Sequence, residues 1–464
     1  MAISIGRLAS LGSCSGGRQS RRPPRHHGTV TEVGGEDAKV WAKRDAAVVW
    51  HGFTQMSSYA ESTPITVDRA EGHELIDVDG KRYLDAVSSL WVNTIGHRVP
   101  GLDDALREQI EHGAHSTMLG NGNRIVIELG EALAPLVPVD DPHFLFAGDG
   151  ASAVEQALKI AFQYWANQGI EDRAKFLAFG GAYHGDTIGA LSVGDGGFGT
   201  ELFDPLLFPV LRAPGFGDPD CFVIAAEMIE RHASELAAVI IEPLVQAAAG
   251  MQMAPPESFA VLGDACRAND VLLICDEVAT GFGRTGTLFA SEQCGLRPDL
   301  MALGKGLTAG YLPQSATAAS GRVFDAFLGP DLSEKTLYHG HSYGGNALAC
   351  AVALRHLELI DTLDVLANVC ARSAELRDLL DDRVISRPEV ADIRLQGLMC
   401  GIELAPPEDG LRWGRRVCAA AVRRSVLLRP IGDVVIVMPP LTITTAELER
   451  IVDTLVASLD EVCM

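Results

Sequence analysis

The sequence predicts an α/β fold in which a large domain holds a mostly parallel central sheet and a smaller domain is α+β. Short apolar segments alternate with longer amphipathic ones through most of the chain, which is the pattern of strands joined by crossover helices. Residues 237–241 and 271–275 are apolar throughout, as parallel strands buried on both faces are. About the last hundred residues instead mix short strands with helices.

The first predicted elements are a hairpin and two helices. Residues 73–78 and 82–86 lie on either side of Asp79-Gly80, a pair that favours a tight hairpin turn. Apolar residues then recur at helical spacing over 102–112 and 125–136. We therefore expect a small sheet to precede the central one.

The central sheet and the C-terminal elements follow in order. We expect its strands at 143–146, 175–179, 237–241, 271–275 and 300–303, with helices over 152–167 and from Asn346 onwards. Beyond residue 350 we expect one strand over 393–403, helices over 411–424 and 445–459, and short strands near Leu427 and Val434. These elements divide the chain into an N-terminal part of the small domain (36–90), the large domain (91–350) and the C-terminal part of the small domain (351–464).

Residues 1–35 have a different composition from the rest. The first thirty include five arginines and no acidic residue, together with serine, glycine and Pro23-Pro24. An Arg-rich, acid-poor composition is shared by organelle transit peptides. No amphipathic helix of useful length is visible in the segment, which favours a disordered extension over a targeting signal.

Charge and cysteine content restrict the function classes. The 464 residues carry 38 Lys and Arg against 61 Asp and Glu, a net charge of −23. Nucleic acid and anionic membranes require a basic surface, so we expect small molecules as partners instead. The longest apolar stretches fall short of the ~18–20 residues of a membrane span. The ten cysteines are scattered without a CxxC pair, which indicates reduced thiols of a cytoplasmic protein and no metal site.

A glycine-containing turn joins the first central strand to its helix. Gly148, Gly150 and Ala153 satisfy G-x-G-x-x-[GA], the dinucleotide fingerprint. That fingerprint also needs an acidic residue after the next strand, and 175–179 instead runs into Gly180-Gly181. A phosphate cup at the helix N-terminus is therefore favoured over a dinucleotide site; a tight turn without a ligand is the remaining alternative.

Three further residues suggest a cofactor. Lys305, one of only seven lysines, directly follows the apolar strand 300–303 and Gly304, and Asp276 directly follows the strand 271–275. A desolvated lysine is a nucleophile able to form a Schiff base, although most lone lysines are simply solvated. A phosphate cup, an acid for the pyridine nitrogen and a Schiff-base lysine are what pyridoxal 5′-phosphate requires. Tyr183 could stack on its ring.

The motifs around these residues resemble a known family. Asp276-Glu-Val-Ala-Thr-Gly-Phe-Gly-Arg284-Thr-Gly and Pro298-Asp-Leu-Met-Ala-Leu-Gly-Lys305-Gly-Leu-Thr are similar to the signature of class III pyridoxal-phosphate aminotransferases. The resemblance runs from about Val48 to the C-terminus. It implies a homodimer of PLP fold-type I, with active sites shared between subunits and a large PLP-binding domain.

The resemblance also implies roles for individual residues. Lys305 forms the Schiff base, Asp276 pairs with the pyridine nitrogen, Gly150 and Ala151 hold the phosphate, and Tyr183 lies against the ring. Gly340 and Ser342 reach the neighbouring subunit's phosphate or substrate. Arg429 binds a substrate carboxylate, which suits a guanidinium fork.

More narrowly, the chain resembles the biotin-pathway branch of this family, which converts 8-amino-7-oxononanoate to 7,8-diaminononanoate. Supporting segments are Trp50-His-Gly-Phe-Thr-Gln-Met56, Ser88-Ser-Leu-Trp91 and Leu428-Arg-Pro-Ile-Gly432. Three substrate-side positions differ from members that use S-adenosylmethionine, namely Phe53, Leu90 beside Trp91, and His341. They look more like a branch that uses L-lysine, so both donors stay open.

Two alternatives remain. Another class III ω-amine transaminase, acting on ornithine, 4-aminobutyrate or a diamine, would keep Lys305 and Asp276 but change the pocket. A non-catalytic relative with a bound phosphate ligand would be the non-enzyme alternative. The joint presence of Lys305, Asp276 and Tyr183 argues against it.

Overall fold

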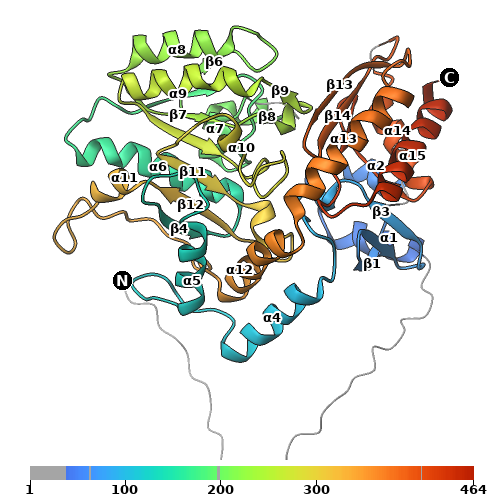
Figure 1. The fold of residues 1–464 in the computed structure, drawn as a ribbon, viewed down its shortest axis with the longest axis horizontal. Coiled ribbons are helices and arrows are strands. Elements are labelled where there is room, and N and C mark those ends of the chain that lie inside the picture. Colours follow the sequence, from blue (N-terminus) through green and yellow to red (C-terminus); the bar gives the residue numbers. More distant parts are fainter. Residues whose placement is uncertain (1–37, 62–63, 196–198, 409, 464) are drawn as a thin grey trace, which may run out of the picture.

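The computed structural model describes residues 38–61, 64–195, 199–408 and 410–463 (Figure 1). The expected N-terminal extension, 1–35, lies outside the described residues. The rest of the chain folds around one large sheet, with a group of smaller sheets and helices beside it, on the right in Figure 1.

The central sheet has seven strands in the order β4-β12-β11-β10-β7-β5-β6. Only β12 runs antiparallel to its neighbours β4 and β11, so the predicted mostly parallel sheet is confirmed. The bounds are β4 (His143–Ala147), β12 (Ser315–Ala319), β11 (Leu300–Leu303), β10 (Leu272–Asp276), β7 (Leu236–Ile241), β5 (Lys175–Phe179) and β6 (Leu211–Ala213).

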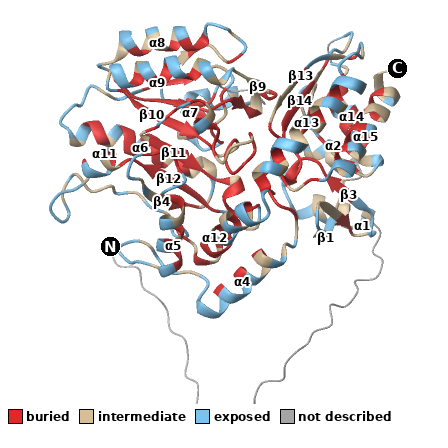
Figure 2. Ribbon diagram, in the orientation of Figure 1, coloured by how far each residue is buried: buried red, intermediate tan, exposed pale blue. Residues whose placement is uncertain are grey.

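Helices cover both faces of this sheet, which explains why its strands are apolar throughout. Along β10, Leu273 and Cys275 pack into one core cluster and Leu272 and Ile274 into another. Helices α8 (Cys221–His232) and α9 (Phe259–Ala268) complete the first cluster, and α6 (Gly150–Asn167) completes the second. The central strands are accordingly the most buried part of the fold (Figure 2).

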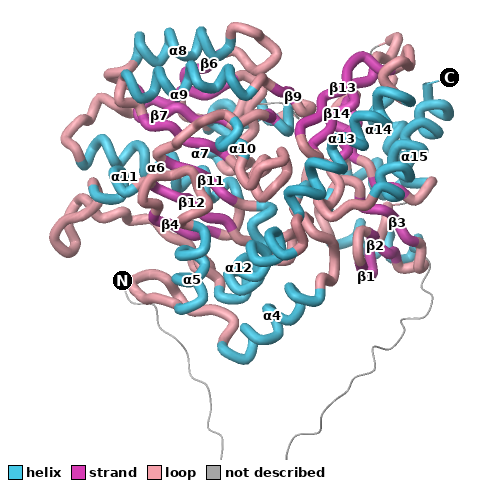
Figure 3. The backbone as a smooth tube through the Cα atoms, viewed as in Figure 1, coloured by secondary structure: helices cyan, strands magenta, loops and turns pink. Residues whose placement is uncertain are grey.

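The remaining helices lie either around these layers or beside the smaller sheets, on the right in Figure 3. They are α1 (Ala38–Val48), α2 (Met56–Glu61), α4 (Pro100–His112), α5 (Arg124–Leu133), α7 (Ile188–Val193), α10 (Ala290–Gln293), α11 (Gly321–Asp325), α12 (Ala347–Thr362), α13 (Val365–Arg383), α14 (Trp413–Arg423) and α15 (Thr445–Cys463). No helix among the described residues is long and apolar enough to cross a membrane.

Strands from the N-terminal and C-terminal parts of the described chain pair in one of the smaller sheets. Strands β1 (Val67–Glu71), β2 (Glu74–Asp77) and β3 (Arg82–Asp85) form the predicted hairpin and its neighbour. The C-terminal β15 (Val426–Leu427) pairs in parallel with β3, placing Val426 opposite Leu84. A second sheet has the order β13-β14-β17-β16, and β8 (Val245–Gln246) pairs with β9 (Gln252–Met253).

The prediction of one strand over 393–403 is wrong. The structure has two antiparallel strands here, β13 (Val390–Gln396) and β14 (Met399–Leu404). Gly397 lies between them at φ 57°, a left-handed conformation that glycine adopts without strain. The neighbouring strands of this sheet are β17 (Val434–Val437) and β16 (Arg429–Ile431).

Candidate active site

The predicted cofactor residues meet at the carboxyl ends of the central strands. Asp276 ends β10, whose register places it beside Ala302 of β11, and Lys305 follows two residues after the end of β11. A Cβ built on Gly304 would lie 3.5 Å from Cα of Gly150, the first residue of α6. Parallel strands place their ligand sites at this edge of a sheet.

The start of α6 is packed closely enough to require glycine. A Cβ at Gly150 would lie 2.5 Å from a methyl group of Val278, and a Cβ at Gly185 would collide with Ala151. Asp149 caps the helix, because its Oδ1 accepts a hydrogen bond from Ser152 N at 2.9 Å. The first N–H groups of a helix and its dipole attract an anion, so this terminus is suited to a phosphate.

Asp276 is held from two sides. Its Oδ2 lies 2.7 Å from Nδ1 of His184, and its Oδ1 accepts a hydrogen bond from Val278 N at 3.0 Å. Both the Asp276 and His184 side chains are buried. The sequence analysis missed His184, although it directly follows Tyr183, because a histidine next to an aromatic residue carries no signal of its own.

Lys305 lies in a strained and desolvated position. Its φ is 41°, in the left-handed region that non-glycine residues rarely occupy. Burial lowers the pKa of its amine, more than the nearby Asp276 and Glu242 carboxyls raise it. Its Nζ lies 5.3 Å from the centre of the Trp91 ring. A lowered pKa increases the share of neutral, nucleophilic amine at neutral pH.

Glu242 is a second site residue that sequence reasoning missed. Glu242 directly follows strand β7, just as Asp276 is the last residue of strand β10. Its side chain is almost completely buried. Its Oε1 accepts a hydrogen bond from Tyr183 N at 3.1 Å and its Oε2 one from Ala247 N at 3.3 Å. The pKa of Glu242 is raised to about 7, mainly by burial; the Asp276 carboxylate contributes to the rise and His184 opposes it. An acidic residue directly after an apolar central strand was the available signal.

The predicted substrate residues differ in their exposure. Phe53, Leu90 and Arg429 are exposed, whereas Trp91 is buried. Arg429, on β16, forms no ion pair with any residue that the structure describes, so its guanidinium is available to a carboxylate.

The loop containing Gly340, His341 and Ser342 contacts another surface segment. The Ser342 carbonyl lies 2.7 Å from Nε2 of His115, and a Cβ at Gly340 would lie 2.7 Å from Leu119. Within the described chain, no hydrogen bond joins residues 340–342 to Lys305, Asp276 or Tyr183.

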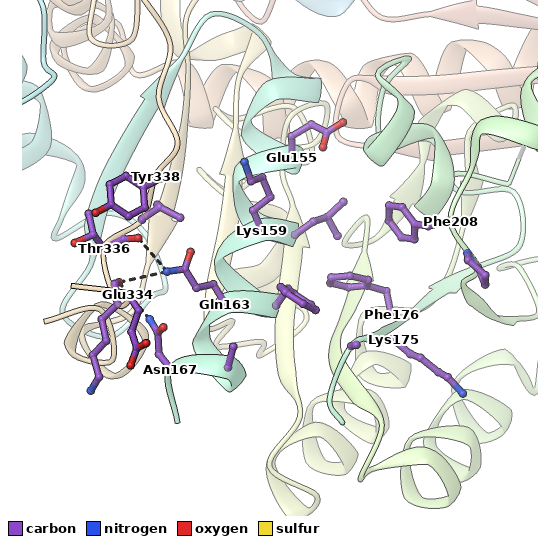
Figure 4. Close-up of a pocket in the computed structure, with 17 residues that line it drawn as sticks. Glu155, Lys159, Gln163, Asn167, Lys175, Phe176, Phe208, Glu334, Thr336 and Tyr338 are labelled. Carbon is purple, nitrogen blue, oxygen red and sulfur yellow. Dashed lines mark hydrogen bonds between the residues drawn. The ribbon is translucent and has the colours of Figure 1, made fainter. Parts of the chain in front are cut away.

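A cavity of about 880 Å³ lies beside the outer face of α6 (Figure 4). Lys159 and Gln163 of α6, Phe176 of β5 and Tyr338 line it. Gln163 donates hydrogen bonds to the carbonyls of Lys335 and Thr336 across it. None of the predicted site residues lines this cavity, so it is separate from the cluster around Lys305.

Comparison with known proteins decides the family. Residues 56–459 match the family described as aminotransferase class-III. The chain belongs to this family. The fold is accordingly that of the fold-type I transaminases, and the family's cofactor is pyridoxal phosphate.

Several named relatives of this class-III chain are similar over most of its length. It is 45% identical to adenosylmethionine-8-amino-7-oxononanoate aminotransferase of Nitratidesulfovibrio vulgaris, covering 88% of this chain and 80% of the relative. The Geobacter sulfurreducens protein of the same name is 40% identical, covering 91% and 97%. The crystal structure of the Methanocaldococcus jannaschii protein of that name superposes with a TM-score of 0.89 at 39% identity, covering 92% and 100%.

Transaminases with other names share the fold. An (S)-enantioselective ω-transaminase from Thermomicrobium roseum gives a TM-score of 0.87 at 32% identity, covering 93% of this chain and 100% of that one. An amine transaminase from an uncultivated Pseudomonas species, solved in its PLP-bound form, gives 0.85 at 32%, covering 89% and 99%.

The residues present fit pyridoxal phosphate. The glycine-packed start of α6, the buried Asp276 and the desolvated Lys305 supply an anion site, a fixed negative charge and an amine in one place. Among the described residues, no cluster of three or more His, Cys, Asp or Glu side chains could hold a metal ion.

Proposed function

We propose that the chain is a PLP-dependent aminotransferase that converts 8-amino-7-oxononanoate to 7,8-diaminononanoate, with S-adenosylmethionine or L-lysine as the amino donor. The observation that carries the proposal is the Lys305–Asp276 pair at adjacent strand ends, in a chain 38–45% identical to four relatives that bear this enzyme's name. Arg429 is exposed and has no ion pair within the part of the chain that the structure describes, which suits an acceptor that carries a carboxylate.

Each residue has a distinct task in this proposal. Pyridoxal phosphate, when bound, supplies the electron sink that stabilises a carbanion. Lys305 would hold the cofactor covalently, and its amine, set free when a substrate amine takes its place, would carry a proton to or from the substrate carbon. Asp276, oriented by His184, keeps the pyridine nitrogen protonated. Gly150 and Ala151 bind the phosphate, and Tyr183 lies against the ring.

The substrate side consists of Phe53, Leu90, Trp91 and Arg429. Arg429 binds the carboxylate of the oxo acid. Phe53 and Leu90 present only apolar atoms where a hydroxyl or a second indole would contact a sulfonium nucleoside. These residues favour L-lysine, whereas the name of the similar relatives specifies adenosylmethionine, so both donors belong to the proposal.

We also propose a homodimer in which Gly340, His341 and Ser342 complete the partner's site. The loop that holds them carries Tyr338 and Tyr343, which are exposed together with the neighbouring Leu119. Exposed aromatic and aliphatic side chains in one place are typical of an interface.

The pairing of β15 with β3 supports a small domain made of residues 36–90 and 351–464, with residues 91–350 as the large domain. The buried free thiols support a cytoplasmic location.

A donor assay tests the function. Purified protein is incubated with pyridoxal phosphate, 8-amino-7-oxononanoate and either S-adenosylmethionine or L-lysine, and 7,8-diaminononanoate is measured by mass spectrometry. One donor should give product, and Lys305→Ala should abolish it. Lys175→Ala, at an exposed lysine paired with Glu235, should retain activity. Absence of product with both donors would refute the substrate assignment.

An ω-amine transaminase is the second candidate. The Thermomicrobium roseum enzyme is named as one and shares this fold at 32% identity. Turnover of ornithine, 4-aminobutyrate or a diamine, without turnover of the oxo acid, would favour it.

A further inference from the structure

The segment from Ser88 to Trp91 (α3) has a left-handed backbone. Its four residues have φ values of 51°, 48°, 70° and 69°. A left-handed backbone is unfavourable for L-residues because Cβ approaches the following carbonyl oxygen, and runs without glycine are rare. Something outside the segment must therefore hold it.

Asp85, the last residue of β3, accepts two hydrogen bonds from the turn and makes a third contact outside it. Its Oδ1 accepts a hydrogen bond from Ser89 N at 2.9 Å, and its Oδ2 accepts one from Ser89 Oγ at 2.7 Å. The same Oδ2 lies 3.2 Å from Nε2 of His97. Asp85 is completely buried, so these contacts replace all of its hydration.

The far side of the turn is fixed to the C-terminal part of the chain. Ser88 Oγ donates to the Met438 carbonyl at 2.7 Å, and Met438 N donates to the Ala86 carbonyl at 2.8 Å. Leu441 N donates to the Thr94 carbonyl at 2.6 Å. The turn is thus attached at its beginning and just after its end, and among the described residues Asp85 is the one whose side chain binds both the backbone and the side chain of Ser89.

The turn determines where two predicted substrate residues lie. It packs the Trp91 ring 5.3 Å from Lys305 Nζ and leaves Leu90 46% exposed. A right-handed backbone at these positions would direct both side chains elsewhere.

We propose that Asp85 is a positioning residue that holds the left-handed turn Ser88–Trp91, and so places Trp91 and Leu90 as the substrate-side wall next to Lys305. The inference rests on the proposed function for its kinetic consequence only. Asp85 touches neither Lys305 nor any group that reacts, and it acts through Ser89.

Asp85→Asn tests the proposal with a matched control. In asparagine an NH2 group replaces Oδ2 and cannot accept a hydrogen bond, so the contacts with Ser89 Oγ and His97 weaken. Asp77→Asn is the control, because Asp77 is a buried carboxylate of the same sheet. It accepts hydrogen bonds from the backbone N–H groups of Asp79 and Lys81 and from the hydroxyl of Tyr83. Ser89→Gly in the Asp85→Asn background is the rescue, because glycine adopts φ 48° without strain.

Hydrogen exchange by mass spectrometry and steady-state kinetics are the two readouts, both on the full chain with pyridoxal phosphate. In Asp85→Asn, the peptide covering 86–94 should exchange faster and the KM for 8-amino-7-oxononanoate should rise roughly tenfold, as for one lost hydrogen bond. We expect kcat to change less than about threefold. Asp77→Asn should leave both values unchanged, and the rescue should lower KM again.

The opposite results overturn the proposal. They are an unchanged exchange rate at 86–94, a KM within twofold of wild type, an equal KM rise in Asp77→Asn, or no recovery in the double variant. If the wild type does not turn over the oxo acid, the proposed function fails. The exchange of 86–94 then decides the role of Asp85 by itself.

Discussion

His184 Nδ1 lies 2.7 Å from Oδ2 of Asp276, and both side chains are buried. A buried carboxylate is stable only when its oxygens are hydrogen-bonded. The other oxygen of Asp276 is bound by Val278 N, so His184 is the only side chain in the described chain that donates to this carboxylate. In the proposed function, the orientation of Asp276 toward the pyridine nitrogen therefore depends on His184.

Replacing His184 by Ala should lower kcat. Hydrogen bonds to charged groups contribute about 1.5–3 kcal/mol, which corresponds to roughly a 10–150-fold loss if the pairing matters in the transition state. Steady-state rates of His184→Ala against wild type measure this. His112→Ala, at an exposed position on α4, is the control and should keep its rate. A His184→Ala rate within twofold of wild type would contradict the assigned orientation.

The start of α6 should tolerate no side chain at Gly150. A Cβ there would lie 2.5 Å from Val278, and overpacking of this kind costs typically about 1–3 kcal/mol. Gly150→Ala should therefore melt at a lower temperature and bind pyridoxal phosphate more weakly in an absorbance titration. Gly148→Ala is the matched control, since a Cβ at Gly148 has no atom within 4 Å. Equal cofactor affinity in the two variants would argue against a phosphate site at this helix terminus.

Glu242 should make stability depend on pH. Its folded pKa of about 7 exceeds the model-peptide value of 4.5, so the unfolded chain loses the proton first as the pH rises. The stabilisation is therefore complete below pH about 4.5 and is lost as the pH rises through about 7, by at most about 3 kcal/mol. His184, Asp276, Lys305 and Tyr183 are charged or titratable neighbours at this site.

Thermal unfolding at pH 5–8 measures the effect. The melting temperature of the wild type should fall faster with pH than that of Glu242→Gln, which cannot titrate. The absolute stability of Glu242→Gln should also be lower, because its amide nitrogen faces a backbone N–H. Glu257→Gln, at an exposed position, should follow the wild-type slope. Parallel profiles for Glu242→Gln and wild type would contradict the raised pKa.

The central sheet could be predicted from the sequence because burial on both faces leaves a continuous apolar run. The predicted strands 175–179 and 300–303 coincide with β5 and β11. Lys305 and Asp276 were found because charged residues stand out after such runs. The 393–403 segment was misjudged because its apolar character continues on both sides of Gly397, so only the positive φ of that glycine marks the turn.

The left-handed turn and its support could not be predicted. Ser88-Ser-Leu-Trp91 contains no glycine, so its letters carry no sign of a positive φ. The conformation depends on Asp85, which is close in sequence. It also depends on Met438 and Leu441, which are about 350 residues further along the chain. Contacts between such distant segments leave no local pattern.

Arg429 should govern affinity for the carboxylate of the acceptor. It is exposed on β16 without an ionic partner among the described residues, so its replacement costs little stability and tests recognition directly. Arg429→Ala should raise the KM for 8-amino-7-oxononanoate roughly 10–150-fold, the loss of a charged hydrogen-bonded pair. Arg429→Lys should recover only part of the affinity, because an ammonium cannot bind a carboxylate through two parallel bonds.

Arg424→Ala is the control, since Arg424 pairs with Glu461. A KM for the oxo acid that is equal in Arg429→Ala and wild type would show that another group binds the carboxylate.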